Sequence, residues 1–116
     1  MYKIEIEDLV ANSLIEVMQK KNKRFITCEE VLKFGETVID ILNKEEKQAI
    51  LLLSRDRTYN FLYDNRNIFE EIDIDGKTGY RVKDNITVAD LIYKFRGYLS
   101  FSVLLAVIEA SNILYN

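Results

Sequence analysis

The feature that most constrains this fold is a change in the period of the apolar residues partway along the chain. In the first part apolar side chains recur every three to four residues, as amphipathic helices require. Later, Ile72 and Ile74 alternate with charged residues, and so do Tyr80 and Val82, which is the period of a strand. We therefore predict an α+β fold that is mostly helical, with a single β-hairpin. With 116 residues, no Pro and no repeat, we expect residues 1–116 to form one domain.

Two helices are predicted from the first part of the chain. Residues 5–21 form an amphipathic helix, which the polar run Lys20–Arg24 ends. Thr27 followed by Glu30 is typical of a capping box, in which the hydroxyl and the carboxylate satisfy backbone N–H groups at a helix start. The buried face of this second helix is predicted to be Val31, Phe34, Val38, Ile41 and Leu42.

Two further caps predict two more helices. Asn43 with Glu46 repeats the capping pattern and predicts a short third helix through Ala49–Leu53. Ser54 is placed as the N-cap of a helix over residues 55–66.

The hairpin is predicted to close through a five-residue loop, Asp75–Gly79. In that register Ile74 faces Tyr80 and Ile72 faces Val82, so that one face is apolar throughout. The other face is charged.

A final helix is predicted after Thr87 and Asp90, which resemble another cap, and it runs to about Leu114. Its second half is apolar around nearly its whole circumference, so it must be buried. Interspersed polar residues argue against a membrane span, and a domain of this size cannot cover the helix on all sides. We therefore expect a homodimer, with the interface formed by Tyr98, Phe101, Leu104, Leu105 and Ile108.

The composition excludes many enzyme classes. The chain has no His and no Trp, which removes Ser-His and Cys-His pairs and every His-based metal site. The single Cys28 cannot form an intramolecular disulfide, and no signal pattern opens the chain, so a cytoplasmic location is expected. We expect no catalytic residues, no metal and no cofactor, and interpret the chain as a binding module.

The order of these elements resembles that of the winged helix-turn-helix family. Residues 53–62, LSRDRTYNFL, look like the turn and recognition helix, and residues 69–83, FEEIDIDGKTGYRVK, look like the wing that follows. The resemblance covers residues 28–84, with an N-terminal helix and basic loop over 5–27 and a C-terminal helix over 85–116. It implies a DNA-binding transcriptional regulator whose recognition helix enters the major groove while the wing touches the backbone.

A second register of the same resemblance stays open. It fuses residues 44–66 into one long helix and makes residues 5–21 the first helix of the family pattern. Both registers place residues 54–66 directly before the wing.

The resemblance also indicates which side chains meet DNA. Arg and Asn read base edges by paired hydrogen bonds, and Tyr, Arg and Lys contact phosphate. The predicted groove contacts are Arg55, Arg57, Asn60 and Tyr63, flanked by Arg66. The predicted phosphate contacts are Lys77 at the hairpin tip and the cluster Lys20, Lys21, Lys23 and Arg24.

The charge balance favours an alternative function. The net charge is −3, and the hairpin carries Glu70, Glu71, Asp73 and Asp75, which phosphates would repel. The alternative is a protein-binding adaptor or inhibitor, of the kind that phages and mobile elements encode, which uses its acidic wing against a basic partner.

Overall fold

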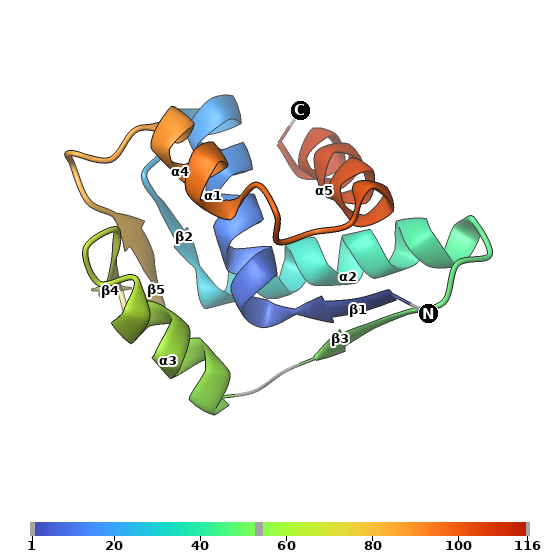
Figure 1. Cartoon of the computed structure of the whole chain (residues 1–116), viewed down its shortest axis with the longest axis horizontal. Coiled ribbons are helices and arrows are strands. Elements are labelled where there is room, and N and C mark those ends of the chain that lie inside the picture. Colours follow the sequence, from blue (N-terminus) through green and yellow to red (C-terminus); the bar gives the residue numbers. More distant parts are fainter. Residues whose placement is uncertain (1, 53–54, 116) are drawn as a thin grey trace.

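The chain folds into a mixed α+β structure in which a three-stranded antiparallel sheet lies at one side of the helices and two further strands form a parallel pair (Figure 1). The computed structural model describes residues 2–52 and 55–115, and for residues 55–59 it describes the backbone alone. The α+β prediction is confirmed. In chain order the elements are β1 (Tyr2–Glu5), α1 (Ile6–Lys21), β2 (Phe25–Thr27), α2 (Cys28–Lys44), β3 (Ala49–Leu52), α3 (Arg55–Asp64), β4 (Phe69–Ile74), β5 (Lys77–Val82), α4 (Val88–Phe95) and α5 (Phe101–Leu114).

The predicted first helix is present as α1, and it is the most deeply buried element. It ends where Asn22 adopts a left-handed conformation and donates its backbone N–H to the Met18 carbonyl. Residues on nearly every side of α1 are buried, because α2, α4, α5 and β2 all pack against it (Figure 1). Its interior side chains include Leu9, Val10, Leu14 and Val17, none of which is exposed.

The second helix is confirmed with its cap and its buried face. The Glu30 backbone N–H donates to Thr27 Oγ1 over 3.1 Å, and the Thr27 N–H donates to Glu30 Oε1 over 3.3 Å. All five residues predicted for the inner face are buried, namely Val31, Phe34, Val38, Ile41 and Leu42.

The predicted short helix over Ala49–Leu53 is wrong, and so is the alternative helix over 44–66. Glu46 adopts a left-handed φ of 60°, which ends helical geometry. Residues 49–52 form β3, which pairs in parallel with β1 so that Tyr2 lies opposite Ala49. Ser54, the predicted N-cap of the next helix, lies outside the described residues. A short apolar run is compatible with a helix or a strand. Here the pairing with β1 makes residues 49–52 a strand.

The hairpin is present, but its predicted register is wrong. Asp75 and Gly76 have φ values of 52° and 80° and form a two-residue turn, for which Asp-Gly is a preferred sequence. Ile74 therefore pairs with Lys77, and Ile72 pairs with Gly79. The consequence is that the apolar face is interrupted: Ile72 is only half-buried, and Ile74 is exposed.

A third strand, which the sequence did not reveal, completes the sheet. The short strand β2 pairs antiparallel with β5, which gives the order β2-β5-β4. The two strands approach closely at Gly79, where an added Cβ would lie 2.5 Å from the Ile26 carbonyl oxygen. This position therefore requires glycine.

The C-terminal part differs from the single helix predicted. The capping box of Thr87 with Asp90 is confirmed, and the Asp90 N–H donates to Thr87 Oγ1 over 3.2 Å. However, α4 ends at Phe95, and Ser100 caps a separate helix, α5, by accepting from the Val103 N–H over 3.4 Å. The break lets α4 and α5 pack on different parts of α1, as Figure 1 shows.

Substitution of Gly79 tests the packing of β2 on the hairpin. We expect Gly79→Ala to lower the free energy of unfolding by roughly 1–3 kcal/mol, because the methyl group collides with backbone. Gly97→Ala is the matched control: no atom lies within 4 Å of its added Cβ, and we expect a change within about 0.5 kcal/mol. Chemical denaturation measures both. Equal stability of the two variants would contradict the β2–β5 pairing.

Candidate functional site

The aromatic cluster beneath α3 fixes the position of that helix. Phe61 of α3 lies 5.6 Å from Phe69 of β4 and 5.8 Å from Phe95 of α4, measured between ring centroids. Phe69 and Phe95 stack at 5.7 Å, and Tyr98 meets the edge of Phe95 at 5.2 Å. These packed aromatic rings thus join α3, the hairpin and α4.

The end of α3 is held by a buried amide. The Asn65 Nδ2 donates to the Phe61 carbonyl over 2.8 Å, and the Asn65 carbonyl accepts from the backbone N–H groups of Ile68 and Phe69. The helix itself ends at Asp64, two residues before the predicted end. Phe61 and Asn65 are buried, as their predicted place on the inner face requires.

The outward face of α3 carries the predicted polar residues wherever side chains are described. Asn60 is exposed, and Tyr63 has 57% of its surface exposed. Arg66 donates from Nη1 to the Tyr63 carbonyl over 2.8 Å, and its guanidinium lies 4.5 Å from the centre of the Tyr63 ring. This stacking holds the cation at the surface. The side chains of Arg55 and Arg57 lie outside the described residues, although both positions belong to α3.

A shallow groove of about 320 Å³ separates α3 from the hairpin. Its floor is apolar, from Leu62 and Phe69, and its rim carries charges of both signs. The rim is formed by Tyr63, Arg66, Glu70, Glu71 and Lys83.

The hairpin is more acidic than a phosphate-binding wing should be. The Lys77 Nζ lies 3.3 Å from Glu29 Oε2, and Arg81 forms ion pairs with Glu70 and Asp84. Its two basic groups are thus neutralised. Within the described part of the chain, the exposed Glu71, Asp73 and Asp75 form no such ion pair.

The basic cluster Lys20–Arg24 does not join the α3 surface. Asn60 and Asp64 line one hollow together with Glu7, near the start of α1, whereas Lys20 lies 13 residues further along the helix, about 20 Å away at 1.5 Å per residue. Figure 1 shows the end of α1 at the top and α3 at the lower left. The expectation that this cluster contacts phosphate beside the wing stays a prediction, and for Lys20 it requires a duplex that extends beyond α3. Arg24 lies against the base of the hairpin, where its carbonyl accepts from the Val82 N–H over 2.8 Å.

Two members of that basic cluster also hold the fold together. Arg24 donates from Nη2 to the carbonyls of Lys83 and Ile86, the latter over 2.5 Å. Lys23 forms an ion pair with Glu30 over 3.1 Å, and its Nζ lies 4.4 Å from the centre of the Phe25 ring. Lys20 and Lys21 remain exposed.

Glu30 joins the ends of three helices. Its carboxylate accepts from the Thr27 N–H, from Lys23 Nζ and, over 3.0 Å, from the Tyr115 hydroxyl just beyond α5. Partial burial opposes ionisation of this carboxyl, but these hydrogen bonds outweigh burial and lower its pKa below the ordinary value of 4.5. Burial, and then the Glu30 carboxylate, raise the pKa of the Tyr115 hydroxyl.

Cys28, the single cysteine, is half-buried at the start of α2. Burial, followed by a hydrogen bond with Cys28, raises the pKa of the Tyr80 hydroxyl on β5. Within the described part of the chain, no group of Cys, Asp or Glu side chains is arranged to hold a metal ion.

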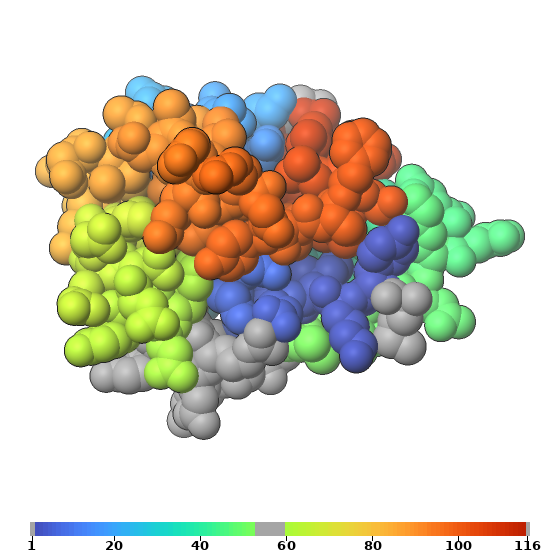
Figure 2. All heavy atoms as spheres, in the orientation of Figure 1, coloured from blue at the N-terminus to red at the C-terminus, as the bar shows by residue number. Residues whose placement is uncertain are grey.

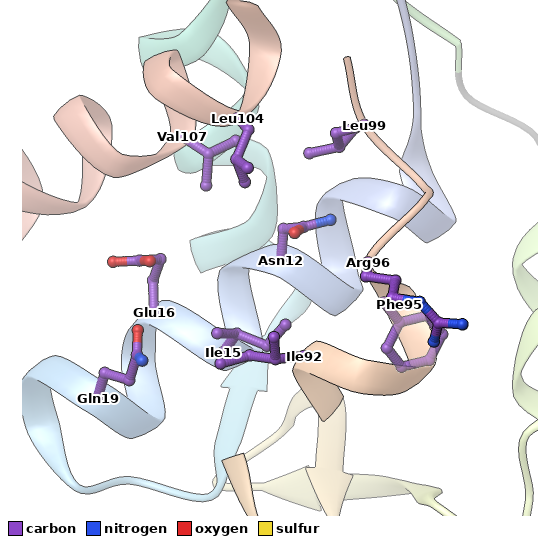
Figure 3. Close-up of a pocket in the computed structure, with 10 residues that line it drawn as sticks. All are labelled: Asn12, Ile15, Glu16, Gln19, Ile92, Phe95, Arg96, Leu99, Leu104 and Val107. Carbon is purple, nitrogen blue, oxygen red and sulfur yellow. The ribbon is translucent and has the colours of Figure 1, made fainter. Parts of the chain in front are cut away.

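An apolar pocket of about 270 Å³ opens between α1, α4 and α5 (Figure 3). Its walls come from all three helices and from the segment between α4 and α5, and a few polar groups stand at its margin. The apolar walls are Ile15, Ile92, Phe95, Leu99, Leu104 and Val107, and the polar groups are Asn12, Glu16, Gln19 and Arg96. Periodicity did not reveal this pocket, because it depends on the break between α4 and α5.

The residues predicted for a dimer interface form part of an exposed apolar surface beside this pocket. Tyr98, Phe101, Leu104, Leu105 and Ile108 are all among the large exposed apolar side chains. The opposite face of α5 is buried in the chain itself through Val103, Ala106, Val107 and Ala110. A single chain thus covers one face of α5 and leaves the other exposed, as expected for a domain of this size, and the homodimer that would cover the second face stays a prediction.

Comparisons with protein-family models, with curated proteins and with solved structures found no match. No helix among the described residues is long and apolar enough to cross a membrane.

The low pKa of Glu30 predicts a dependence of stability on pH. Because the folded state favours the ionised carboxylate, this stabilisation is present above about pH 4.5 and is lost as the pH falls through the lowered pKa. We expect Glu30→Gln, which retains a capping-box acceptor, to be less stable at pH 7 by roughly 0.5–1 kcal/mol. The difference should shrink below pH 4.5 in denaturation experiments.

Glu29→Gln is the matched control, since Glu29 is the neighbouring carboxylate and its ion pair with Lys77 is largely exposed. We expect a change below about 0.3 kcal/mol at any pH. A Glu30→Gln variant with the same pH profile as the wild-type chain would contradict the role assigned to Glu30.

Proposed function

We propose that the protein binds duplex DNA as a regulator of winged helix-turn-helix type, with α3 in the major groove and the hairpin turn against the adjacent backbone. The observation that carries the proposal is the polar outer face of α3, where Asn60 and Tyr63 are exposed on a helix that the aromatic cluster holds in place, with Arg66 exposed two residues beyond its end and stacked on Tyr63. Asn and Arg read base edges, and Tyr and Arg bind phosphate.

Under this proposal α1 is the first helix of the family pattern, α2 the second and α3 the recognition helix, followed by the β4–β5 hairpin as the wing. This order shares its first helix with the second register, but the single helix over residues 44–66 on which that register depends is absent. The chain also departs from the simplest helix-turn-helix pattern between α2 and α3. There, ten residues, which include the strand β3, replace a turn of three or four residues.

The proposed DNA surface is small and mixed in charge. Arg66, Lys83 and the positions of Arg55 and Arg57 are basic, whereas Asp64 and Glu71 lie close to them. Lys77 is placed at the hairpin turn for a phosphate contact, and its exposed ion pair with Glu29 is weak enough to exchange for one. We therefore expect few phosphate contacts, weak binding, and a loss of affinity with salt that is proportional to the number of those contacts.

Fluorescence anisotropy with a random-sequence duplex tests the proposal. We expect weak binding at about 50 mM salt that largely disappears at about 200 mM. The double variant Arg55→Ala/Arg57→Ala should bind roughly tenfold more weakly or worse, since each residue supplies a groove or phosphate contact.

Lys20→Ala/Lys21→Ala is the charge-matched control, because it removes the same charge at the far end of α1. We expect a change of less than about threefold. Equal losses for the two double variants would indicate nonspecific attraction rather than recognition by α3, and no binding at about 50 mM salt would overturn DNA binding.

The acidic hairpin favours one second candidate, an adaptor that binds a basic protein. Glu71, Asp73 and Asp75 project from the hairpin without an ion pair to any described residue, and the neighbouring cations are neutralised. A chain that ignores duplex DNA but binds a basic protein, with binding lost in Glu71→Gln/Asp73→Asn, would support this candidate. If binding survives this double substitution, the hairpin is not the surface that binds the basic protein.

A further inference from the structure

The surface formed by α4, α5 and the segment between them is the largest gathering of exposed apolar side chains among the described residues. On α5, Phe101, Leu104, Leu105 and Ile108 follow each other at spacings of three and four, so they share one face. Figure 2 shows residues of these segments, in orange to red, side by side on one face of the molecule. The complete surface, here called the α4–α5 surface, consists of Ile92, Tyr93, Tyr98, Phe101, Leu104, Leu105 and Ile108.

From this surface we infer that the protein binds a second copy of itself, with Phe101 of each copy inserted into the α1–α4–α5 pocket of the other. The inference does not rest on DNA binding, since its centre is the exposed face of α5. Tyr98, at the edge of the surface, lines a hollow with Asn60 and Asp64 of α3. The two copies form a symmetric pair in which each contributes the same surface.

The area of the surface matches the apolar centre of a dimer interface. Its seven side chains are between 38% and 75% exposed, and together they present on the order of 600 Å² of apolar area, at roughly 150–200 Å² per side chain. A standard interface removes about 800 Å² from each partner, including a polar rim. Polar residues next to the surface, such as Gln19 and Arg96 at the pocket margin, supply that rim.

The charge pattern allows two copies to meet here. Between Gly97 and Leu114 the only charged residue is Glu109. Two copies of this surface therefore come together with little repulsion between like charges, although the whole chain carries −3. The outer face of α3 and the hairpin, by contrast, are crowded with charges.

The shape of the surface supplies a projection and a matching hollow. Phe101 is 75% exposed at the first position of α5, and Leu104, one turn later, lies at the pocket shown in Figure 3. One helical turn spans about 5 Å, so the projecting ring and the hollow lie close together on the same face. A twofold axis that passes midway between Phe101 and the pocket would place each Phe101 opposite the pocket of the other copy.

The pocket is suited to an aromatic ring. Ile15, Ile92, Leu99 and Val107 give it apolar walls, and Phe95 offers a ring for aromatic contact. Its volume of about 270 Å³ is sufficient for one aromatic side chain and too small for a helix.

The oligomeric state of the full chain tests the inference. We expect light scattering after gel filtration to give twice the chain mass of 13.6 kDa at about 100 μM protein, with dissociation on dilution toward the micromolar range. A wild-type chain that stays at 13.6 kDa at about 100 μM overturns the inference and leaves the surface to a partner of different chemistry.

Two matched substitutions locate the interface. Leu105→Asp places a charge at the centre of the surface and should give a monomer, whereas Leu32→Asp, at a leucine of similar exposure on α2, should remain a dimer. Far-UV circular dichroism verifies that both variants are folded. A dimer that persists in folded Leu105→Asp, or that is lost equally in Leu32→Asp, overturns the assignment.

Phe101→Ala tests the insertion of the ring without adding charge. Because Phe101 is largely exposed in the single chain, its removal should leave the thermal midpoint of the monomer unchanged while the dimer dissociation constant rises roughly tenfold or more. An unchanged dissociation constant would overturn the insertion of Phe101 into the pocket.

Discussion

The burial of α1 on almost every side is the constraint on which the rest of this structure depends. A helix of 16 residues that exposes so little apolar surface needs neighbours around its whole circumference, and α2, α4, α5 and β2 supply them. One of its buried polar side chains, Asn12, is accommodated within the helix, where its Nδ2 donates to the Asp8 carbonyl over 2.8 Å. The break between α4 and α5 follows from the same need, since one continuous helix could not cover two sides of α1.

This central helix also separates the surfaces on which function is proposed. At its start lie α3 and the aromatic cluster, and at its end lie the basic residues that bond to Glu30 and to the carbonyls after β5. Lys23 and Arg24, just beyond its end, therefore serve mainly to join segments of the fold. The apolar α4–α5 surface lies between these two regions, because α4 and α5 cover α1 along its length.

Local signals predicted the starts of α2 and α4 and the buried face of α2 well. The capping boxes at Thr27 and Thr87 are present, because a cap depends only on residues within one turn, whereas the similar pair Asn43 and Glu46 begins no helix. Asn60 and Tyr63, two of the predicted groove contacts, are exposed on α3. Strand pairing was predicted poorly: β3 was mistaken for a helix, and the hairpin register was wrong because the Asp75–Gly76 turn outweighed the apolar pattern.

The sequence by itself determined the fold class, the capped starts of α2 and α4 and the exposure of Asn60 and Tyr63 on α3, since these depend mainly on neighbours along the chain. Only the tertiary structure decided that residues 49–52 pair with the N-terminus, that β2 joins the hairpin and that Lys20 lies far from α3. It also decided which side of α5 remains exposed. The physical reason is that a strand is stable only when a partner satisfies its backbone groups, and that partner is set by the packing of the whole chain.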